Sequence, residues 1–317
     1  MNSRHAVFVI DPPERLDPPT DTSLALMREL VGRDWQVHWT SLDGLCLRDG
    51  NPWAMTRPVR FPDAAELFGP SEPEEFDLSR AEMLFMRKDP PVDLAYLHAA
   101  LILDRLPPRV LQINPAKTLH LHCEKLIPAL FPALAPASLV SSDTHRLEDF
   151  LREQQHIVIK PLEDCSGHGV HELRRGDSNA RPLLASLTQE GRRFLQAQRF
   201  LPEIQDGDKR VLLLDGEILG WVRRVPAPGD FRSNVNAGGR CLPCDLSEND
   251  RRICAMLSPW LRREGILLAG IDIVGDKVLE VNITSPSCLR EINQLTGQRL
   301  ETRIIDVLET RAGQGRT

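Results

Sequence analysis

Apolar and polar positions near the start of the chain alternate in a way that predicts strands and helices in turn. Residues 5–10 (HAVFVI) are mostly apolar and β-branched, as is typical of a buried strand, and a proline-rich loop follows. Polar residues 21–23 (DTS) then precede leucines at helical spacing, and residues 35–40 alternate as a second strand. A strand, a helix and a strand at this spacing form a βαβ unit. We therefore expect an α/β N-terminal domain with a largely parallel sheet.

The same pattern continues to about residue 120. Residues 62–76 are rich in proline and acidic residues, which predicts a surface loop, and residues 83–86 read as another strand. Arg87 follows that strand, at the edge of the sheet where open α/β folds bind ligands, although a charged turn ended by prolines is the alternative. A helix over 93–106 and a strand over 110–114 complete the domain, and a further helix is expected from Leu119 onward.

The second half of the chain has a more α+β pattern. Two strands at 210–214 and 217–222, joined by Asp215-Gly216, predict a hairpin, and a glycine- and proline-rich loop follows. Two further strands meet at Gly275-Asp276 and precede one final helix. The expected segments of this half are strands at 156–161, 170–173, 194–201, 268–274 and 277–281, a mobile loop at 226–239 and a helix at 249–264.

Three oxygen-bearing side chains on the last predicted hairpin form the strongest chemical signal. Asp272 lies within an apolar strand, where a carboxylate is costly unless it is paired or binds a cation. Glu280 and Asn282 are two residues apart, so both project from one face of their strand, and the hairpin can bring Asp272 opposite them. This set suits Mg²⁺, with Mn²⁺ as an alternative. A salt-bridged sheet surface is the competing interpretation, but no lysine or arginine lies at the matching positions of the hairpin.

Composition narrows the class of protein. The chain has 317 residues with a formal net charge of −6, which lacks the basic excess of a nucleic-acid binder. No apolar run approaches the length of a membrane span, and the N-terminus does not resemble a signal peptide. We therefore expect an enzyme-sized cytoplasmic protein that has neither nucleic acid nor membrane as a partner. We also expect a homo-oligomer.

Cysteine and lysine usage adds two observations. The seven cysteines are an odd number spread along the chain, which favours reduced thiols, and Cys241 and Cys244 alone are weak evidence for zinc. Only six lysines stand against 33 arginines, so a lysine marks a place where a compact ammonium can matter. This observation draws attention to Lys125 and Lys160.

The motifs along nearly the whole chain resemble the bacterial type of glutathione synthetase, a family of ATP-grasp ligases. The resemblance implies an N-terminal Rossmann-like (pre-ATP-grasp) domain over residues 1–120 and an ATP-grasp domain of two subdomains over residues 121–317, with a lid subdomain at about 125–202. The segments that carry it are IDP (10–12), DTS (21–23), MRKDPP (86–91), CEKL (123–126), IKPL (159–162), DGDKRV (206–211), NAGGR (236–240), GIDI (270–273) and EVNITSP (280–286).

This resemblance also implies a reaction and a set of site residues. The reaction is the ATP- and Mg²⁺-dependent joining of γ-glutamylcysteine and glycine through an acyl-phosphate, with ATP as co-substrate. Lys125, Lys160 and Arg210 would act on the phosphates, and Asp272, Glu280 and Asn282 would hold the metal. The remaining implied contacts are Gly167, Gly169, Gln198, Phe200, Leu201, Asp208 and Arg224 for the nucleotide, and Ser285, Ser287, Arg290 and Arg87 for the other substrates.

One segment departs from the family pattern. The glycine-rich loop after Lys160 carries Asp164 and Ser166 where small, flexible residues are expected. A carboxylate beside a triphosphate is unfavourable unless it points away or meets a second cation, for which His168 is a candidate. Two alternatives therefore stay open: a divergent ATP-grasp ligase for another acid and amine, or a non-catalytic nucleotide- or peptide-binding relative. Residues 226–239 would form a lid that contains Arg232 and follows Arg224.

Overall fold

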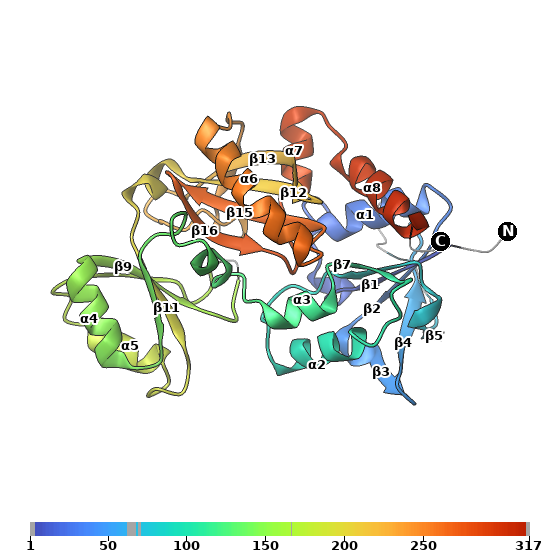
Figure 1. Ribbon diagram of the computed structural model, residues 1–317, viewed down its shortest axis with the longest axis horizontal. Coiled ribbons are helices and arrows are strands. Elements are labelled where there is room, and N and C mark those ends of the chain that lie inside the picture. Colours follow the sequence, from blue (N-terminus) through green and yellow to red (C-terminus); the bar gives the residue numbers. More distant parts are fainter. Residues whose placement is uncertain (1–3, 62–67, 69–70, 166, 315–317) are drawn as a thin grey trace.

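The computed structural model describes residues 4–61, 68, 71–165 and 167–314, which form three β-sheets with helices packed around them. The sheets have seven, four and five strands and follow one another along the longest axis of the molecule (Figure 1). The seven-stranded sheet is N-terminal, and the four-stranded sheet lies at the opposite end. The five-stranded sheet lies between them.

The N-terminal sheet has a parallel centre, as predicted. Its parallel strands β1 (His5–Val9), β2 (Gln36–Thr40), β6 (Met83–Met86) and β7 (Leu111–Ile113) pair in the order β2-β1-β6-β7. Helix α1 (Thr22–Val31) is capped by the Asp21 side chain, which accepts from the Leu24 amide, and α2 (Leu94–Leu103) is capped by Asp93 in the same way. These caps fix both helix starts where the sequence placed them.

An antiparallel extension of this sheet was not predicted. Strands β3 (Leu45–Arg48), β4 (Asn51–Pro58) and β5 (Glu74–Asp77) pair antiparallel beyond β2. Asp49 and Gly50 both have positive φ and form the two-residue turn between β3 and β4. The surface loop expected over 62–76 is wrong at its end, where β5 pairs with β4, while residues 62–67 and 69–70 lie outside the described residues.

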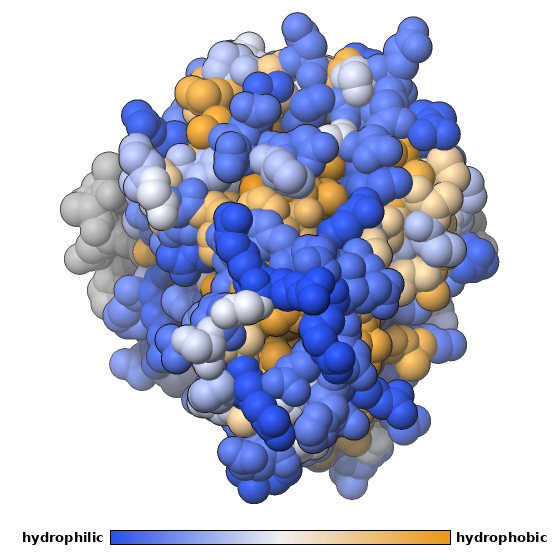
Figure 2. All heavy atoms as spheres, turned by 90° about the vertical axis from the view of Figure 1, so that its left-hand side faces the viewer, coloured by the Kyte–Doolittle hydropathy of each residue, from blue (hydrophilic) through white to orange (hydrophobic). Residues whose placement is uncertain are grey.

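The four-stranded sheet and two helices form a separate unit at one end of the molecule. Strands β8 (Ser138–Ser141), β9 (His156–Pro161), β10 (His171–Arg174) and β11 (Leu195–Arg199) are antiparallel in the order β10-β9-β11-β8. Helices α4 (Thr144–Gln154) and α5 (Ala180–Leu187) bury leucines against the sheet. The end of the molecule formed by this unit is mostly hydrophilic (Figure 2).

The five-stranded sheet carries both predicted hairpins. Its order is β14 (Arg240–Leu242), β13 (Glu217–Val225), β12 (Asp208–Leu214), β15 (Leu268–Val274) and β16 (Lys277–Asn282), all antiparallel. Helix α6 (Glu248–Arg263) begins with a capping box between Ser247 and Asp250 and covers one face of the sheet. The predicted strands and helix of this region are confirmed.

The C-terminus contains two helices where one was predicted. Helix α7 (Leu289–Thr296) ends at Gly297, whose φ of +68° reverses the chain, and α8 (Leu300–Gln314) follows. Ile304 and Leu308 of α8 pack in the same apolar cluster as Leu24 of α1, so the C-terminal helix covers the N-terminal sheet's first helix.

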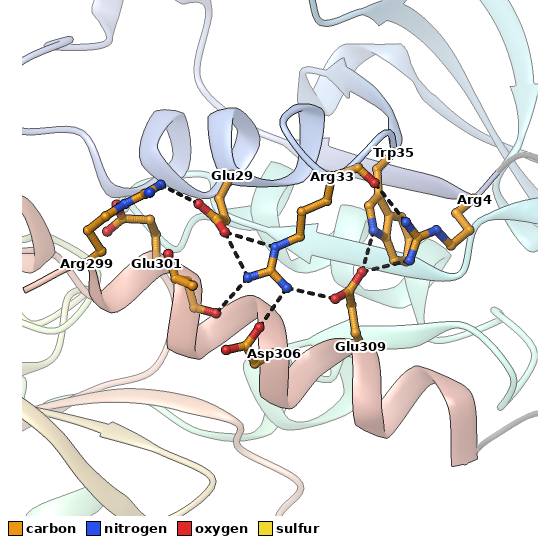
Figure 3. A network of polar contacts seen from close by, with 9 residues as sticks. Arg4, Glu29, Arg33, Trp35, Arg299, Glu301, Asp306 and Glu309 are labelled. Carbon is orange, nitrogen blue, oxygen red and sulfur yellow. Dashed lines mark hydrogen bonds and ion pairs between the residues drawn. The ribbon is translucent and has the colours of Figure 1, made fainter.

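Ion pairs reinforce this contact between the two ends of the chain (Figure 3). Arg33, just beyond α1, donates to Glu29 on its own helix and to Asp306 and Glu309 on α8, at 2.7–2.9 Å. Trp35 donates from its indole nitrogen to Glu309 at 2.8 Å. Among the described residues, no helix is long and apolar enough to cross a membrane.

Candidate active site

Two adjoining cavities lie around the five-stranded sheet. The smaller, of ≈ 100 Å³, lies between that sheet and the four-stranded unit, and the larger, of ≈ 420 Å³, lies between that sheet and the N-terminal sheet. Glu280 and Arg224 line both cavities. A molecule in the smaller cavity can therefore meet a molecule in the larger one at these two side chains.

The predicted carboxylate pair is present on adjacent strands. Asp272 of β15 lies directly opposite Glu280 of β16, and a bulge follows Asp272. The expectation that no cation matches these positions is wrong, because β12 on the other side of β15 places Arg210 opposite Asp272. Arg210 donates to Asp272 at 2.5 and 2.9 Å, and Arg224 lies 2.9 Å from the same carboxylate. The hairpin alone could not reveal cations supplied by the neighbouring strands.

The two guanidinium groups determine the charge of Asp272. Burial by itself would raise the pKa of this carboxyl group, but Arg210 and Arg224 more than offset it and lower the pKa to about 2. Asn282 donates from its amide nitrogen to Gly270 O and to Asp272 Oδ2, at 3.1 and 3.2 Å. Both bonds use the nitrogen, so the Asn282 carbonyl oxygen is the atom that can bind a cation. Asp272, Glu280 and Asn282 thus form a compact group of oxygen donors.

Both predicted lysines line the smaller cavity. Lys160, near the end of β9, donates to Gln198 Oε1 at 2.9 Å, and burial lowers its pKa. Lys125 lies 3.5 Å from Glu280, and although burial lowers its pKa, the charges of Glu280 and Glu124 more than offset this and raise it. Two ammonium groups from separate parts of the chain thus converge on one cavity.

The helix expected from Leu119 onward is misplaced, and Lys125 is not helical. Helix α3 (Ala116–Leu121) ends before Lys125, which lies in a turn. Glu124 fixes this turn, because its buried carboxylate accepts from the amides of Ile283 and Thr284 at 2.6 and 2.7 Å. Hydrogen bonds from the two residues that follow β16 thus fix this turn in place of helical hydrogen bonds. They hold Lys125 beside Glu280.

Most of the other residues expected around a nucleotide also line the smaller cavity. Phe200 stacks on His156 with 3.8 Å between ring centroids, and Asp208 is buried and accepts from Arg224 at 2.8 Å. Gly169 does not line the cavity, since it packs on Pro161, and Arg210 lines the larger cavity. The expected residues that do line the smaller cavity are Gly167, Gln198, Phe200, Leu201, Asp208 and Arg224.

The unusual loop contains a cation partner that the sequence analysis missed. Arg193 donates to Asp164 at 3.0 Å and to Glu163 at 3.1 Å, so a guanidinium meets the carboxylate that the family pattern lacks. Arg193 precedes β11, about thirty residues along the chain from the loop, and only the strand order β9-β11 brings the two together. His168, the candidate cation, lines the smaller cavity, and Ser166 lies outside the described residues.

The segment 226–239 contributes to the walls of both cavities. Arg232 and Asn234 line the smaller cavity, and Asn234 also lines the larger one. Arg232 pairs with Asp230 at 2.7 Å and donates to Gly167 O at 3.3 Å. Gly167 has φ +77°, and a Cβ there would lie 3.1 Å from the Arg232 side chain, so this contact requires glycine. The segment and the loop after Lys160 therefore touch above the smaller cavity.

The larger cavity contains most of the other predicted substrate residues. Arg87 is buried there and donates to Ser23 Oγ and Pro286 O, both at 3.1 Å, while its Nη1 has no hydrogen-bond partner among the described residues. Ser285 and Ser287 line the cavity as well. Arg290 does not, because its guanidinium turns to Pro19 O at 3.3 Å. An unsatisfied guanidinium nitrogen beside a cavity is suited to an anion such as a carboxylate.

Comparison with known proteins identifies close sequence relatives. Residues 5–120 match the family model "Prokaryotic glutathione synthetase, N-terminal domain", and residues 124–297 match "Prokaryotic glutathione synthetase, ATP-grasp domain". The chain is 37% identical over 313 residues to the glutathione synthetase of Synechocystis sp., covering 95% of this chain and 98% of that protein. It is 34% identical over 307 residues to that of Vibrio cholerae, covering 96% of each.

Solved structures agree on the fold. The D-cycloserine synthetase DcsG superposes with a TM-score of 0.67 at 16% identity, covering 96% of this chain and 99% of that one. The ATP-grasp ligase PsnB, in complex with a precursor variant, Mg and ADP, gives a TM-score of 0.65 at 15% identity and covers 98% of this chain and all of its own. At these identities the likeness establishes the ATP-grasp fold alone.

Proposed function

Because the chain belongs to the prokaryotic glutathione synthetase family, we propose that it joins γ-glutamylcysteine to glycine at the expense of ATP. The observation that carries this proposal is the meeting of the two cavities at Glu280 and Arg224. A ligase of this kind must bring the terminal phosphate of ATP against the carboxylate of the acid. A nucleotide cavity and a peptide cavity that share charged lining residues satisfy this requirement.

In the smaller cavity we assign the nucleotide to the lysines and to the segment around Gln198. Lys125 and Lys160 supply two positive charges to the phosphates, and Lys160, whose pKa burial lowers, gains most from a phosphate partner because its present partner Gln198 is neutral. Phe200 and Leu201 offer an apolar wall for a base. Arg224 and Arg210 lie on the side facing the peptide cavity, next to where the transferred phosphoryl group would pass.

The oxygen donors of Asp272, Glu280 and Asn282 fit Mg²⁺ better than a softer metal. Their carboxylate and amide oxygens lie on neighbouring positions of β15 and β16, and Glu280 opens into both cavities. When bound, Mg²⁺ would neutralise phosphate charge and align the phosphates. For Asp272 to join that shell, Arg210 and Arg224 must give up part of their present contact with it and can turn to phosphate oxygens.

In the larger cavity the peptide would present its carboxylate toward Glu280 and Arg210. Phosphoryl transfer to that carboxylate gives ADP and an acyl-phosphate, and the glycine amine then attacks the acyl carbon, releasing phosphate and a proton. Arg87, with its unpartnered Nη1 and a buried position, would bind a second carboxylate of the peptide. Residues 226–239 would act as the lid that keeps water from the acyl-phosphate.

The test is an omission assay. Phosphate release should require ATP, Mg²⁺, γ-glutamylcysteine and glycine together, and mass spectrometry should identify the tripeptide. Equal turnover with a different acid or amine would assign the chain to another ligation. Nucleotide binding without any turnover would remove the enzymatic proposal altogether. A homo-oligomeric state and a cytoplasmic location remain predictions that this assay does not address.

A further inference from the structure

Two cysteine side chains meet beside the larger cavity. Cys288, which precedes α7, is 2% exposed and lines that cavity. Cys241 lies in β14, where it pairs with Arg224 of β13. Their sulfur atoms and a carboxylate oxygen of Glu291 all lie within 4.8 Å of one another. The two cysteines are 47 positions apart in the sequence, so only the folded chain makes them neighbours.

The surroundings of Cys288 favour its thiolate. The neighbouring Cys241 thiol and the charges of Arg210 and Arg224 lower the pKa of Cys288 to about 7 despite burial. Cys288 also stands at the N-terminus of α7, where the helix dipole stabilises negative charge. The closeness of Cys288, together with burial, raises the pKa of Cys241. Cys288 is thus the nucleophile of the pair, and Cys241 is the thiol that can resolve it.

A divalent cation suits this group less well than a sulfur–sulfur bond. A structural zinc site has four protein ligands, and among the described residues this group offers only Cys241, Cys288 and Glu291. Burial also raises the pKa of Glu291, which favours a proton on the third possible ligand. The group therefore lacks the full ligand set of a structural metal site.

We propose that Cys241 and Cys288 form a redox-sensitive pair that low-molecular-weight disulfides oxidise through the larger cavity. The Cys288 thiolate attacks one sulfur of R–S–S–R, forming a mixed disulfide and releasing RS⁻. The Cys241 sulfur, after losing its proton, attacks Cys288 Sγ, forming the Cys241–Cys288 bond and releasing a second RS⁻. Two protein thiols are oxidised, one small disulfide is reduced to two thiols, and the two protons end on the released thiols.

The bond would tie the end of segment 226–239 to the start of α7. Cys241 follows this segment by two residues. Asn234 and Val235 of the segment line the larger cavity, and so do Ser285 and Ser287, which precede α7. A covalent link between these two walls would restrict access to the cavity, so oxidation should lower turnover reversibly. This consequence rests on the proposed function, in which the larger cavity holds a thiol peptide whose product can itself form a disulfide.

The test treats the folded full-length protein with bis(2-hydroxyethyl) disulfide, followed by thiol alkylation and peptide mass spectrometry. We expect a cross-linked pair of peptides containing Cys241 and Cys288, two hydrogen atoms lighter than the separate thiol peptides. Cys254, buried in α6, is the matched control and should carry no disulfide in the same sample. In Cys241→Ser, a mixed disulfide should persist on Cys288. Alkylation of both thiols in the treated wild-type protein would overturn the proposal.

Two further readouts separate the alternatives. Turnover of the oxidised protein should fall and return on reduction with dithiothreitol, and treated Cys241→Ser should yield no cross-linked pair of peptides. Zinc retained by the reduced wild-type protein and lost in Cys288→Ser would overturn the thiol assignment in favour of a metal site. Because the probe is not a peptide, the cross-link can form even if the proposed ligase reaction is wrong. A missing cross-link with normal turnover would overturn the proposed redox pair and leave the proposed ligase reaction standing.

Discussion

Asp272 illustrates how much of the site depends on single charged side chains. Its carboxylate holds two guanidinium groups, while among the described residues its cross-strand neighbour Glu280 pairs with Lys125 alone, at 3.5 Å. Removing one partner of such a buried pair leaves an uncompensated charge, which costs more than the pair itself contributes. Glu280 has fewer ion-pair partners than Asp272 and lines both cavities, so it is the better residue for a functional test.

Glu280→Gln should abolish ATP-dependent phosphate release while leaving the fold intact. The amide keeps the size of the side chain and removes the negative charge that the proposed metal requires. Circular dichroism checks the fold, and phosphate release checks the activity. Glu217→Gln is the control, because Glu217 is exposed and lies outside both cavities, and it should keep normal turnover. Normal turnover in Glu280→Gln would remove the metal assignment.

Lys125→Met and Lys160→Met should each weaken nucleotide binding by about tenfold or more, or roughly 1.4 kcal/mol. Methionine retains much of the stem packing and deletes the ammonium that we place against phosphate. Calorimetric titration with a non-hydrolysable ATP analogue measures the change. Lys117→Met is the matched control, because Lys117 is exposed on α3 and should bind nucleotide as the wild type does. Unchanged affinity in both test variants would place the nucleotide elsewhere.

Sequence reasoning found side chains with a chemical signature and missed those whose partners come from distant strands. Asp272 and Glu280 could be predicted to face each other because a two-residue turn joins their strands. Arg193 carried no signature, since its role depends on β11 pairing with β9. The role of Glu124 could not be predicted either, because the amides that donate to its carboxylate lie more than 150 residues away along the chain. Pairings between remote elements are set by the whole fold and not by local pattern.

At the scale of elements, the loop after β9 shows how a departure from the family pattern is compensated. Asp164 would repel a triphosphate, but Arg193, which precedes β11, donates to both Asp164 and Glu163. Burial would lower the pKa of Arg193, and the hydrogen bonds to Asp164 and Glu163 more than offset this and raise it. The loop thus keeps one net negative charge where it would otherwise have two.

Arg193→Gln should weaken ATP binding severalfold, because the two carboxylates then face the phosphates without a cation. Asp164→Gly in the same background should restore much of the affinity, whereas Asp164→Gly alone should improve it only slightly. The comparison forms a double-mutant cycle measured by nucleotide titration. Arg192→Gln, which changes the exposed neighbouring arginine, is the control. Equal affinities in all of these variants would mean that the loop charge does not reach the nucleotide.

Element types were predictable where a local signal was strong, and their boundaries less so. Caps at Asp21 and Asp93 fixed helix starts, and Asp215-Gly216 fixed a hairpin. Asp49-Gly50 is a turn signal of the same kind, but Pro52 and Pro58 in β4 weaken the strand pattern that follows it. The final helix divides at Gly297, because the chain must turn before α8 can pack against α1.

At the scale of the whole molecule, the contact between α1 and α8 joins the two ends of the chain through Arg33. Arg33→Met should lower the free energy of unfolding by about 1–3 kcal/mol, since several charge-assisted hydrogen bonds are lost while the stem is retained. Urea denaturation at neutral pH measures this. Arg48→Met removes an exposed ion pair with Glu75 and should leave stability nearly unchanged, because exposed ion pairs contribute little. Equal effects in the two variants would contradict a structural role for Arg33.

The same contact predicts a pH dependence. Burial raises the pKa of Glu309, but hydrogen bonds from Trp35 and Arg33 more than offset this and lower it below its ordinary value of 4.5. A depressed carboxyl pKa adds stability that is present above that ordinary value and is lost as the pH falls through the folded-state pKa. Wild-type stability should therefore decline below about pH 4.5, and more steeply than in Arg33→Met. Parallel urea midpoints for the two proteins across this range would contradict the assignment.

The position of α8 on α1 also sets the order in which the chain can finish folding on the ribosome. Leu24, Met27 and Leu30 of α1 are completely buried, and part of their cover is Ile304 and Leu308, which are made long after α1. The first sheet can therefore form during synthesis, as N-terminal units generally do, but one flank of it stays open to water until α8 has been made. A newly made chain that stops short of α8 would expose this apolar flank, which makes the truncated product a natural target for chaperones and proteases.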